Sequence, residues 1–299
     1  MAGNSVARVG SILQPCCFVL LLCALLAGCN GLPGSGAGNT SDSASPIRIA
    51  SSPALLPLIS AAVALFERQH PEAQIAVLRD ESAAGLSALA RQQVNLAATI
   101  MYADPSASSS AHLRDALIGV VPFLLVVQHD APLVSLSQAQ IQGIFSTGEI
   151  TDWKQIGSPE QKLVVVLPPL SSDSRFLFRE EMLGSAAEVD NALSADSPET
   201  LRDLVARTPG SIGYLPAPLL NTGVHAVAID GEAATAEQIA SGRYGFWSFA
   251  HLYTWNASTP GAEEAALLLQ FMQSSAVAQL VRQLGYIPLS EMNAVPVSA

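Results

Sequence analysis

Cysteine is missing from the body of this chain. All four cysteines (Cys16, Cys17, Cys23 and Cys29) lie near the N-terminus. The rest of the chain therefore has no disulfide, no thiol nucleophile and no thiolate metal site. The five histidines are scattered, without the His-x-x-x-His or Glu-x-x-His spacing of helical metal sites. No Gly-x-Ser-x-Gly motif follows a strand, so a hydrolase of that type has no visible nucleophile.

Positive charge is also scarce. Lysine and arginine together number 14 against 25 acidic residues, which gives a formal net charge of −11 and a calculated pI of about 4.8. A chain this acidic is a poor partner for the phosphate backbone of nucleic acids. We therefore expect no nucleic acid, no cofactor and no metal ion as a partner.

Long hydrophobic runs are absent as well. The longest apolar stretch, Cys16 to Ala27, is preceded by a single charged residue, Arg8, and is too short to span a membrane as a helix. It has the length of a signal-peptide core. It ends in Leu26-Ala27-Gly28-Cys29, which resembles the lipobox of bacterial lipoproteins. We therefore interpret residues 1–28 as a lipoprotein signal peptide and Cys29 as the lipidated residue. An ordinary secretory signal or an uncut anchor are the alternatives.

Residues 29–45 are rich in Gly, Ser, Asn and Ala, which is typical of a flexible tether. The body that follows alternates short apolar strands with amphipathic helical segments. Strands are predicted at 47–50, 75–78, 94–100, 163–167, 224–229 and 249–254, a strand passing between domains at 118–128, and one long helix at 263–284. This alternation indicates an α/β fold with a largely parallel sheet, whose ligands sit at the carboxyl ends of the strands.

Pro168 to Phe178 is the most informative of the loops that follow a strand. It contains small hydroxyl residues and leads into a helix, and such a helix start presents free backbone N–H groups to an anion. Ser172 and Ser174 would add hydroxyl donors. The alternative is that Ser171, Ser172 or Asp173 only caps the helix. This stretch alone does not decide between an anion site and a cap.

Five segments in their order along the chain favour the anion site. They are Gly143 to Trp153, Thr208 to Tyr214, Val227 to Gly231, Ala240 to Tyr244, and Leu284 to Leu289. They resemble the stretches "IFSGKITNW", "TPGAIGY", "LAIDG", "ASGSYP" and "LGYVPL" of the phosphate-binding proteins of ABC transporters. The resemblance implies a type II periplasmic-binding-protein fold: two α/β lobes with a ligand cleft between them. Lobe 1 would combine 46–124 with 224–299, and lobe 2 would be 125–223.

The resemblance also implies a ligand set. The segment Ser171-Ser172-Asp173-Ser174-Arg175 matches the family's "GSGTR" turn. Ser52 falls on the serine of the first loop, Ser82 on that of the second, and Thr99 at the end of the third strand. We therefore expect Ser52, Ser82, Thr99, Ser171, Ser172, Ser174 and Arg175 to bind a small oxyanion or another polar solute.

Some positions depart from the family pattern. Pro168 stands where the family has an arginine, Asp173 replaces the second glycine of the turn, and the family's acidic residue falls near Ile100 or Met101. Each lost charge-assisted contact costs roughly 1.5–3 kcal/mol. We therefore expect phosphate to bind more weakly than in typical relatives, with Arg175 as a substitute guanidinium or as a surface arginine paired with Glu180 or Asp173.

These observations together predict a monomeric, extracytoplasmic solute-binding lipoprotein, not an enzyme, anchored in the bacterial cell envelope and facing the periplasm or the exterior. Its partners would be the solute, the membrane through Cys29, and an ABC permease. The alternative is a diverged lipoprotein that kept the fold but acts in envelope protein interaction or signalling. A periplasmic hydrolase is a third, weaker hypothesis.

Overall fold

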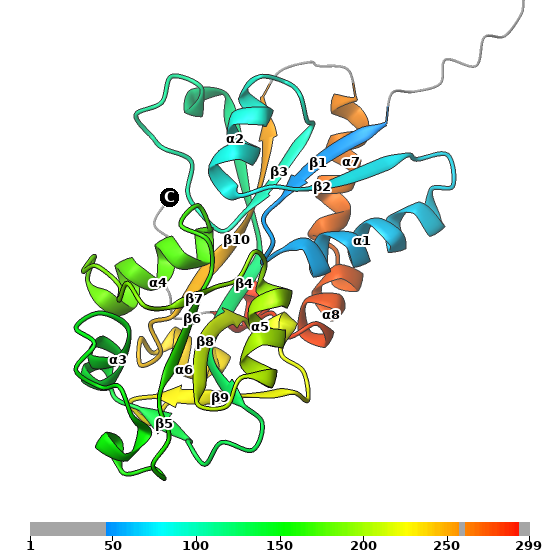
Figure 1. Cartoon of the computed structure of the whole chain (residues 1–299). Coiled ribbons are helices and arrows are strands. Elements are labelled where there is room, and N and C mark those ends of the chain that lie inside the picture. Colours follow the sequence, from blue (N-terminus) through cyan, green and yellow to red (C-terminus); the bar gives the residue numbers. More distant parts are fainter. Residues whose placement is uncertain (1–45, 257–260, 293–299) are drawn as a thin grey trace, which may run out of the picture. The chain divides into compact units, whose positions relative to one another are not determined.

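Strands and helices alternate from the start of the described chain, as the sequence predicts. The computed structural model describes residues 46–256 and 261–292. Its first elements are β1 (Ile47–Ser51), α1 (Leu56–Gln69), β2 (Ile75–Arg79), α2 (Ser82–Ala90) and β3 (Leu96–Thr99) (Figure 1). The strands β1, β2 and β3 pair in parallel. The predicted signal peptide, tether and Cys29 lie outside the described residues.

The long strand β4 (Leu113–Gln128) joins two parts of one sheet. Its first part pairs with β10 (Trp247–Trp255), and its second part pairs with β8 (Ser211–Pro216) and β9 (Val224–Ile229). At the change of partner, Phe123 N donates to Phe246 O at 3.0 Å. We call β1, β2, β3, β10 and the first part of β4 the first half of the sheet, and the remaining strands and the rest of β4 the second half.

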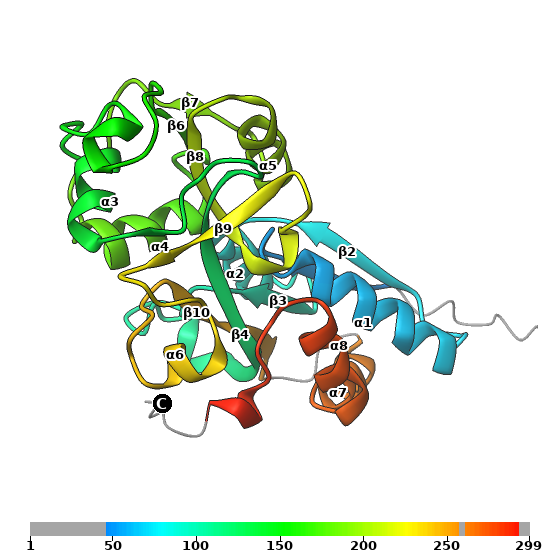
Figure 2. The same ribbon diagram turned by 90° about the horizontal axis from the view of Figure 1, so that it is seen from below.

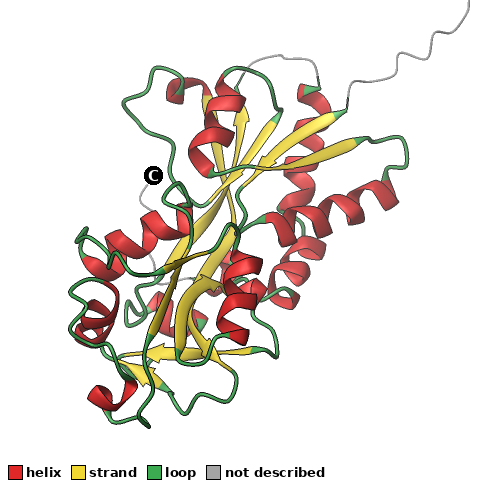
Figure 3. Cartoon of the chain, viewed as in Figure 1, coloured by secondary structure: helices red, strands yellow, loops and turns green. Residues whose placement is uncertain are grey.

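The order of strands in the sheet is β2-β1-β3-β10-β4-β8-β6-β7, and β9 pairs with both β4 and β5. The predicted parallel pairing holds for β1, β2 and β3, but β10 lies antiparallel to both β3 and β4. The sheet is therefore mixed (Figure 3). The other elements are β5 (Ser135–Leu136), α3 (Gln138–Phe145), β6 (Val164–Leu167), α4 (Asp173–Leu183), β7 (Leu193–Ser194), α5 (Pro198–Arg207), α6 (Ala236–Ala240), α7 (Ala262–Met272) and α8 (Ser275–Gln283).

Helices cover both faces of each half. In the first half α1 packs with α7 and α8 over one face, and α2 packs over the other (Figure 2). In the second half α5 packs against β4, β6 and β8 through Leu201 and Val205. The opposite face carries Phe145 of α3 and Phe178 of α4, and Phe178 stacks on Tyr214 with ring centroids 4.1 Å apart. Apolar residues on one stripe of each helix thus form the cores that hold the loops in place.

One predicted element differs in the structure. The single helix predicted at 263–284 is wrong, because the chain breaks into α7 and α8 and Ser274 caps α8 by accepting a hydrogen bond from Val277 N. Gly285 follows α8 with the positive φ of 85° that ends a helix. Because β9 pairs with the second part of β4, we infer that the chain returns to the first lobe between β9 and β10 rather than at residue 224.

Candidate functional site

Three loops at the carboxyl ends of strands approach one another, and each leads into a helix. The loop after β1 carries Ser52 and enters α1, the loop after β2 carries Glu81 and enters α2, and the loop after β6 carries Ser172 and enters α4. Helices α1 and α2 belong to the first half and α4 to the second. The free N–H groups of the first turns make such a meeting point favourable for negative charge.

A carboxylate occupies the centre of this site. Asp173 Oδ2 accepts hydrogen bonds from Ser82 N at 2.8 Å and from Ser82 Oγ at 2.5 Å. In return, Glu81 Oε2 accepts a hydrogen bond from Asp173 N at 3.0 Å. Ser82 Oγ also accepts from Ile100 N at 3.2 Å, which ties the end of β3 to the same cluster. The first turns of α2 and α4 therefore exchange acidic caps between the two halves.

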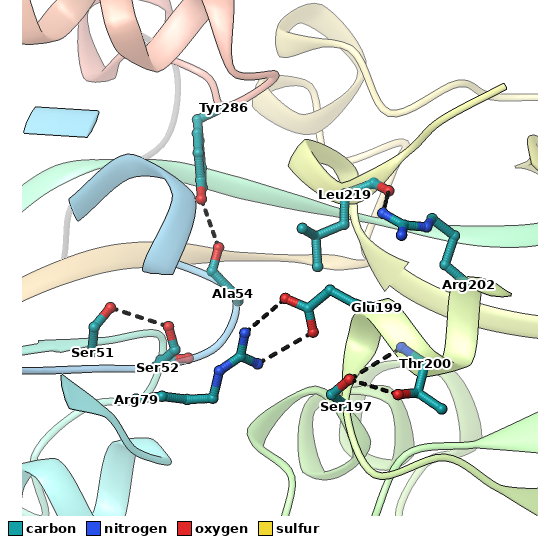
Figure 4. Close-up of polar contacts among 10 residues, drawn as sticks. All are labelled: Ser51, Ser52, Ala54, Arg79, Ser197, Glu199, Thr200, Arg202, Leu219 and Tyr286. Atoms are coloured by element: carbon teal, nitrogen blue, oxygen red, sulfur yellow. Dashed lines mark hydrogen bonds and ion pairs between the residues drawn. The ribbon is translucent and has the colours of Figure 1, made fainter. Parts of the chain in front are cut away.

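Ser52 contributes a buried hydroxyl that faces the Asp173 carboxylate. The residue is 1% exposed, and its Oγ makes no short hydrogen bond, although it lies close enough to Asp173 to lower the pKa of that carboxyl group. Its neighbour Ser51 is equally buried but bonds to Ser52 O at 3.2 Å (Figure 4). A buried polar atom without a partner is costly and calls for an explanation. A bound oxyanion would give this hydroxyl an acceptor.

The pKa values of both acids are raised. Burial is the main cause for Glu81, whose pKa rises to about 7, and the charge of Asp173 adds to the effect. Burial also raises the pKa of Asp173, while the hydrogen bonds from Ser82 oppose the shift. No lysine or arginine of the described chain bonds to either carboxylate, so their charge is balanced only by helix ends and hydroxyls.

The other predicted site residues fall into three groups. Ser172 and Ser174 are buried in the start of α4, beside Asp173. Thr99 is also buried, but its hydroxyl donates to Met101 O at 2.8 Å and so supports the loop after β3. Ser171 is exposed at the edge of the loop. Of the predicted residues, Ser82 bonds to Asp173, Ser52 lies near its carboxylate, and Ser172 and Ser174 flank Asp173 in the chain.

Arg175 does not join these residues. Its Nε donates to Glu188 Oε2 at 2.8 Å and its Nη1 donates to Pro168 O at 2.7 Å. Both partners are well buried, with the Glu188 side chain only 5% exposed. The guanidinium is therefore committed elsewhere and does not replace the arginine that Pro168 displaces.

Hollows flank the cluster on either side. A groove of about 550 Å³ is lined by Ser172, Asp173, Leu86, Tyr102 and Phe176 among others, and its walls are mostly apolar. A smaller pocket of about 230 Å³ is lined by Pro53, Glu81, Pro168 and Ser172. Solutes can thus approach the cluster without crossing a core. The described residues contain no group of three His, Cys, Asp or Glu side chains able to hold a metal ion.

A pair formed by a buried histidine and a partly exposed aspartate lies outside this set and has no sequence signal. His251, fully buried on β10, places Nδ1 at 2.8 Å from Asp115 Oδ2, and its Nε2 has no partner. The exposed ring of Tyr102 packs edge-on against the His251 ring, with ring centroids 4.5 Å apart. His251 and Asp115 are 136 positions apart, so only the antiparallel pairing of β4 with β10 brings them together. The pair supports Tyr102 on the loop after β3.

Sequence reasoning leaves the place of Glu81 open. The sequence allows Asp80, Glu81 and Asp173 either to converge in the cleft, which would favour a cation or an amine-bearing ligand, or to be solvated or cap helices, which is the more common use of loop carboxylates. Glu81 is the N-cap residue of α2, but its side chain makes no bond to that helix. It bonds to α4 instead. Only a contact between residues 92 positions apart reveals this role.

Comparison with known proteins agrees with this architecture. The family model described as a PBP superfamily domain matches residues 35–276. The chain is 32% identical to the phosphate-binding protein PstS of Bacillus subtilis (strain 168) over 286 residues, covering 92% of this chain and 94% of that protein. It is similar to the crystal structure of an ABC-type phosphate transport receptor from Vibrio cholerae, with 26% identity, a TM-score of 0.67, and coverage of 81% of this chain and 99% of that one.

A further structural match concerns the fold alone. A putative phosphate ABC transporter substrate-binding protein from Clostridium perfringens, with bound phosphate, is 22% identical with a TM-score of 0.73, covering 82% of this chain and 99% of that one. No helix among residues 46–256 and 261–292 is long and apolar enough to cross a membrane. The family model and the identity with the Bacillus protein together show that this chain belongs to the PstS family of phosphate-binding proteins within the PBP superfamily.

Proposed function

We propose that this protein is the extracytoplasmic substrate-binding component of a phosphate ABC transporter, held at the membrane by a lipid on Cys29. One observation carries the proposal: Ser82 N and Ser82 Oγ hold a carboxylate oxygen at the meeting point of helix starts from both halves. Donors that hold one oxyanion are suited to another of similar size. The relatives are named as phosphate-binding proteins and transport receptors, not as enzymes.

The binding set would consist of Ser52, Ser82, Ser172 and Ser174, with backbone N–H groups of α2 and α4. The two halves would separate to admit the ligand and close around it. Because Arg175 is tied to Glu188, hydroxyls and helix ends would supply the attraction. Binding would therefore be weaker than in a site that contains a guanidinium.

Ser52 gives the sharpest test of this function. Its hydroxyl makes no short hydrogen bond in the protein, so Ser52→Ala removes a ligand contact and, within the protein, only the weak interaction with Asp173. A hydrogen bond to a charged acceptor is worth about 1.5–3 kcal/mol, so we expect phosphate to bind roughly ten-fold or more weakly. Isothermal titration calorimetry with phosphate and sulfate measures this.

Ser51→Ala is the matched control, because that hydroxyl is already bonded to Ser52 O. It should bind phosphate as the wild type does. If neither phosphate nor sulfate binds to the wild type, the transport function fails. The alternative, a protein of this fold that acts in envelope interaction or signalling, would then be favoured by the observation that Asp173 already fills the site.

A further inference from the structure

Asp173 and Glu81 form a reciprocal pair between the halves. Asp173 caps α2 through Ser82 N and Ser82 Oγ, and Glu81 caps α4 through Asp173 N. The two N-cap positions, Glu81 and Ser172, make no side-chain bond to their own helices. Each helix start is thus satisfied by an acid from the opposite half, as an external oxyanion would satisfy it.

The surroundings of the Asp173 carboxylate are also those expected around a bound ligand. Asp173 is 7% exposed, receives two hydrogen bonds from Ser82, and lies beside the unpartnered hydroxyl of Ser52. No cation of the described chain pairs with it. Phosphate placed on the same donors would displace it, because these donors cannot serve two anions at once.

We propose that Asp173 is an internal ligand of this site, whose carboxylate bridges the two halves in the absence of solute and competes with phosphate for the donors of Ser82. Only the competition with phosphate rests on the function proposed above. The bridging of the halves is independent of it.

An internal ligand acts at a high effective concentration, because the chain already holds it near its partner. Phosphate affinity is then reduced by the fraction of molecules in which Ser82 is free. No neighbouring charge draws the Asp173 carboxylate away from the donors of Ser82. Glu81 and Asp80 are acidic, and Arg79, which precedes Asp80 in the chain, is paired with Glu199 through Nη2 and Oε1, 2.7 Å apart (Figure 4).

The test compares Asp173→Gly with the wild type, using the chain without its signal peptide. Glycine restores the residue type that the family's turn has at this position and removes the carboxylate. Asp173→Asn keeps the shape but removes the charge. Asp196→Asn is the control, because Asp196 is an exposed acid that lines the small pocket on the side of the second half. Circular dichroism and thermal melting show whether each variant is folded.

Two measurements are made on the folded variants. Small-angle X-ray scattering in phosphate-free buffer reports how far the halves separate, and calorimetry with inorganic phosphate reports affinity. We expect the wild type and Asp196→Asn to stay closed without phosphate. Asp173→Gly should have a larger radius of gyration that shrinks when phosphate is added, and should bind phosphate at least ten-fold more tightly. Asp173→Asn should lie between them.

The proposal is overturned if Asp173→Gly scatters as the wild type does in phosphate-free buffer. It is also overturned if the variant opens and binds phosphate, but no more tightly than the wild type. If the variant opens and neither protein binds phosphate, the bridging role stands and the phosphate-binding function fails. Should glycine prevent folding, the same comparisons with Asp173→Asn decide.

Discussion

Arg79 and Glu199 form a two-pronged ion pair between the end of β2 and the first turn of α5. Nη2 of the arginine lies 2.7 Å from Oε1 of the glutamate, and Nη1 lies 3.3 Å from Oε2. The two residues belong to different halves of the sheet, so this pair and the Asp173 cluster bridge the same gap. Unlike the cluster, the pair is open to solvent, with side chains 41% and 37% exposed.

We expect Glu199→Gln to lower the free energy of unfolding by less than about 1 kcal/mol, because solvent and salt screen exposed ion pairs. The loss should shrink further at high salt. Chemical denaturation at two salt concentrations measures it. Glu160→Gln is the control, since Lys154 and Glu160 form a comparable pair within the second half. A loss of several kcal/mol would show that the pair, rather than the buried cluster, holds the halves together.

Glu81 should make stability depend on pH. Burial raises its pKa in the folded protein from 4.5 to about 7, so the neutral form stabilises the fold. That contribution is complete below about pH 4.5 and is lost as the pH rises through about 7. Asp173, whose pKa is also raised by burial, acts in the same direction.

Glu81→Gln mimics the neutral form and removes this titration. We expect the melting temperature of the wild type to fall relative to that of Glu81→Gln between about pH 5 and pH 8. Glu264→Gln, which changes an exposed glutamate of α7, should instead follow the wild type. Parallel curves for wild type and Glu81→Gln would contradict the role of Glu81.

Phe178 should be among the residues most important for folding of the second half. It is fully buried, stacks on Tyr214 and packs edge-on against Phe145 at 4.8 Å. Phe178→Ala should lower the free energy of unfolding by about 3–5 kcal/mol through lost burial and the cavity left behind. Phe176, two residues earlier and 51% exposed, is the control, and Phe176→Ala should cost less than about 0.5 kcal/mol. Equal losses would contradict the packing.

Tyr286 should fix the start of α1 from the far end of the chain. Its hydroxyl donates to Ala54 O at 2.7 Å, and the side chain is 3% exposed (Figure 4). Tyr286→Phe leaves that carbonyl without its donor and should cost about 1–3 kcal/mol. Tyr102→Phe, which changes an exposed tyrosine, should have no measurable effect on denaturation. If both variants unfold as the wild type does, the bond contributes nothing.

The sequence is a good guide to single elements and a poor one to pairs of distant residues. Alternating apolar segments predict β1, β2, β3 and their helices because strand and helix periods are local. The two helices α7 and α8 are merged in the prediction because their apolar pattern continues past Ser274, and only the hydrogen bond to Val277 N reveals the break.

The candidate site shows the same limit. The family pattern predicts that Ser52, Ser82, Ser172 and Ser174 lie near one ligand, and all four are buried in the structure. The partner of Arg175 is a different matter. Spacing suggests Glu180 or Asp173 on the same helix, whereas the structure pairs it with Glu188 in the loop beyond α4. Likewise, the sequence shows that Asp173 stands where the family has a glycine, but its hydrogen bond from Ser82 follows only from the fold.

The continuity of β4 has a consequence for any partner that recognises the protein by its shape. Because β4 and β10 are hydrogen-bonded where the chain passes between halves, the two halves are joined by one shared pair of strands. If the Asp173 carboxylate and a bound phosphate hold the halves closed in the same way, the empty and the loaded protein would present the same outer face. A transporter could then not distinguish an empty receptor from a loaded one by the angle between halves. The two states would then differ in how easily the halves separate and not in their closed shape.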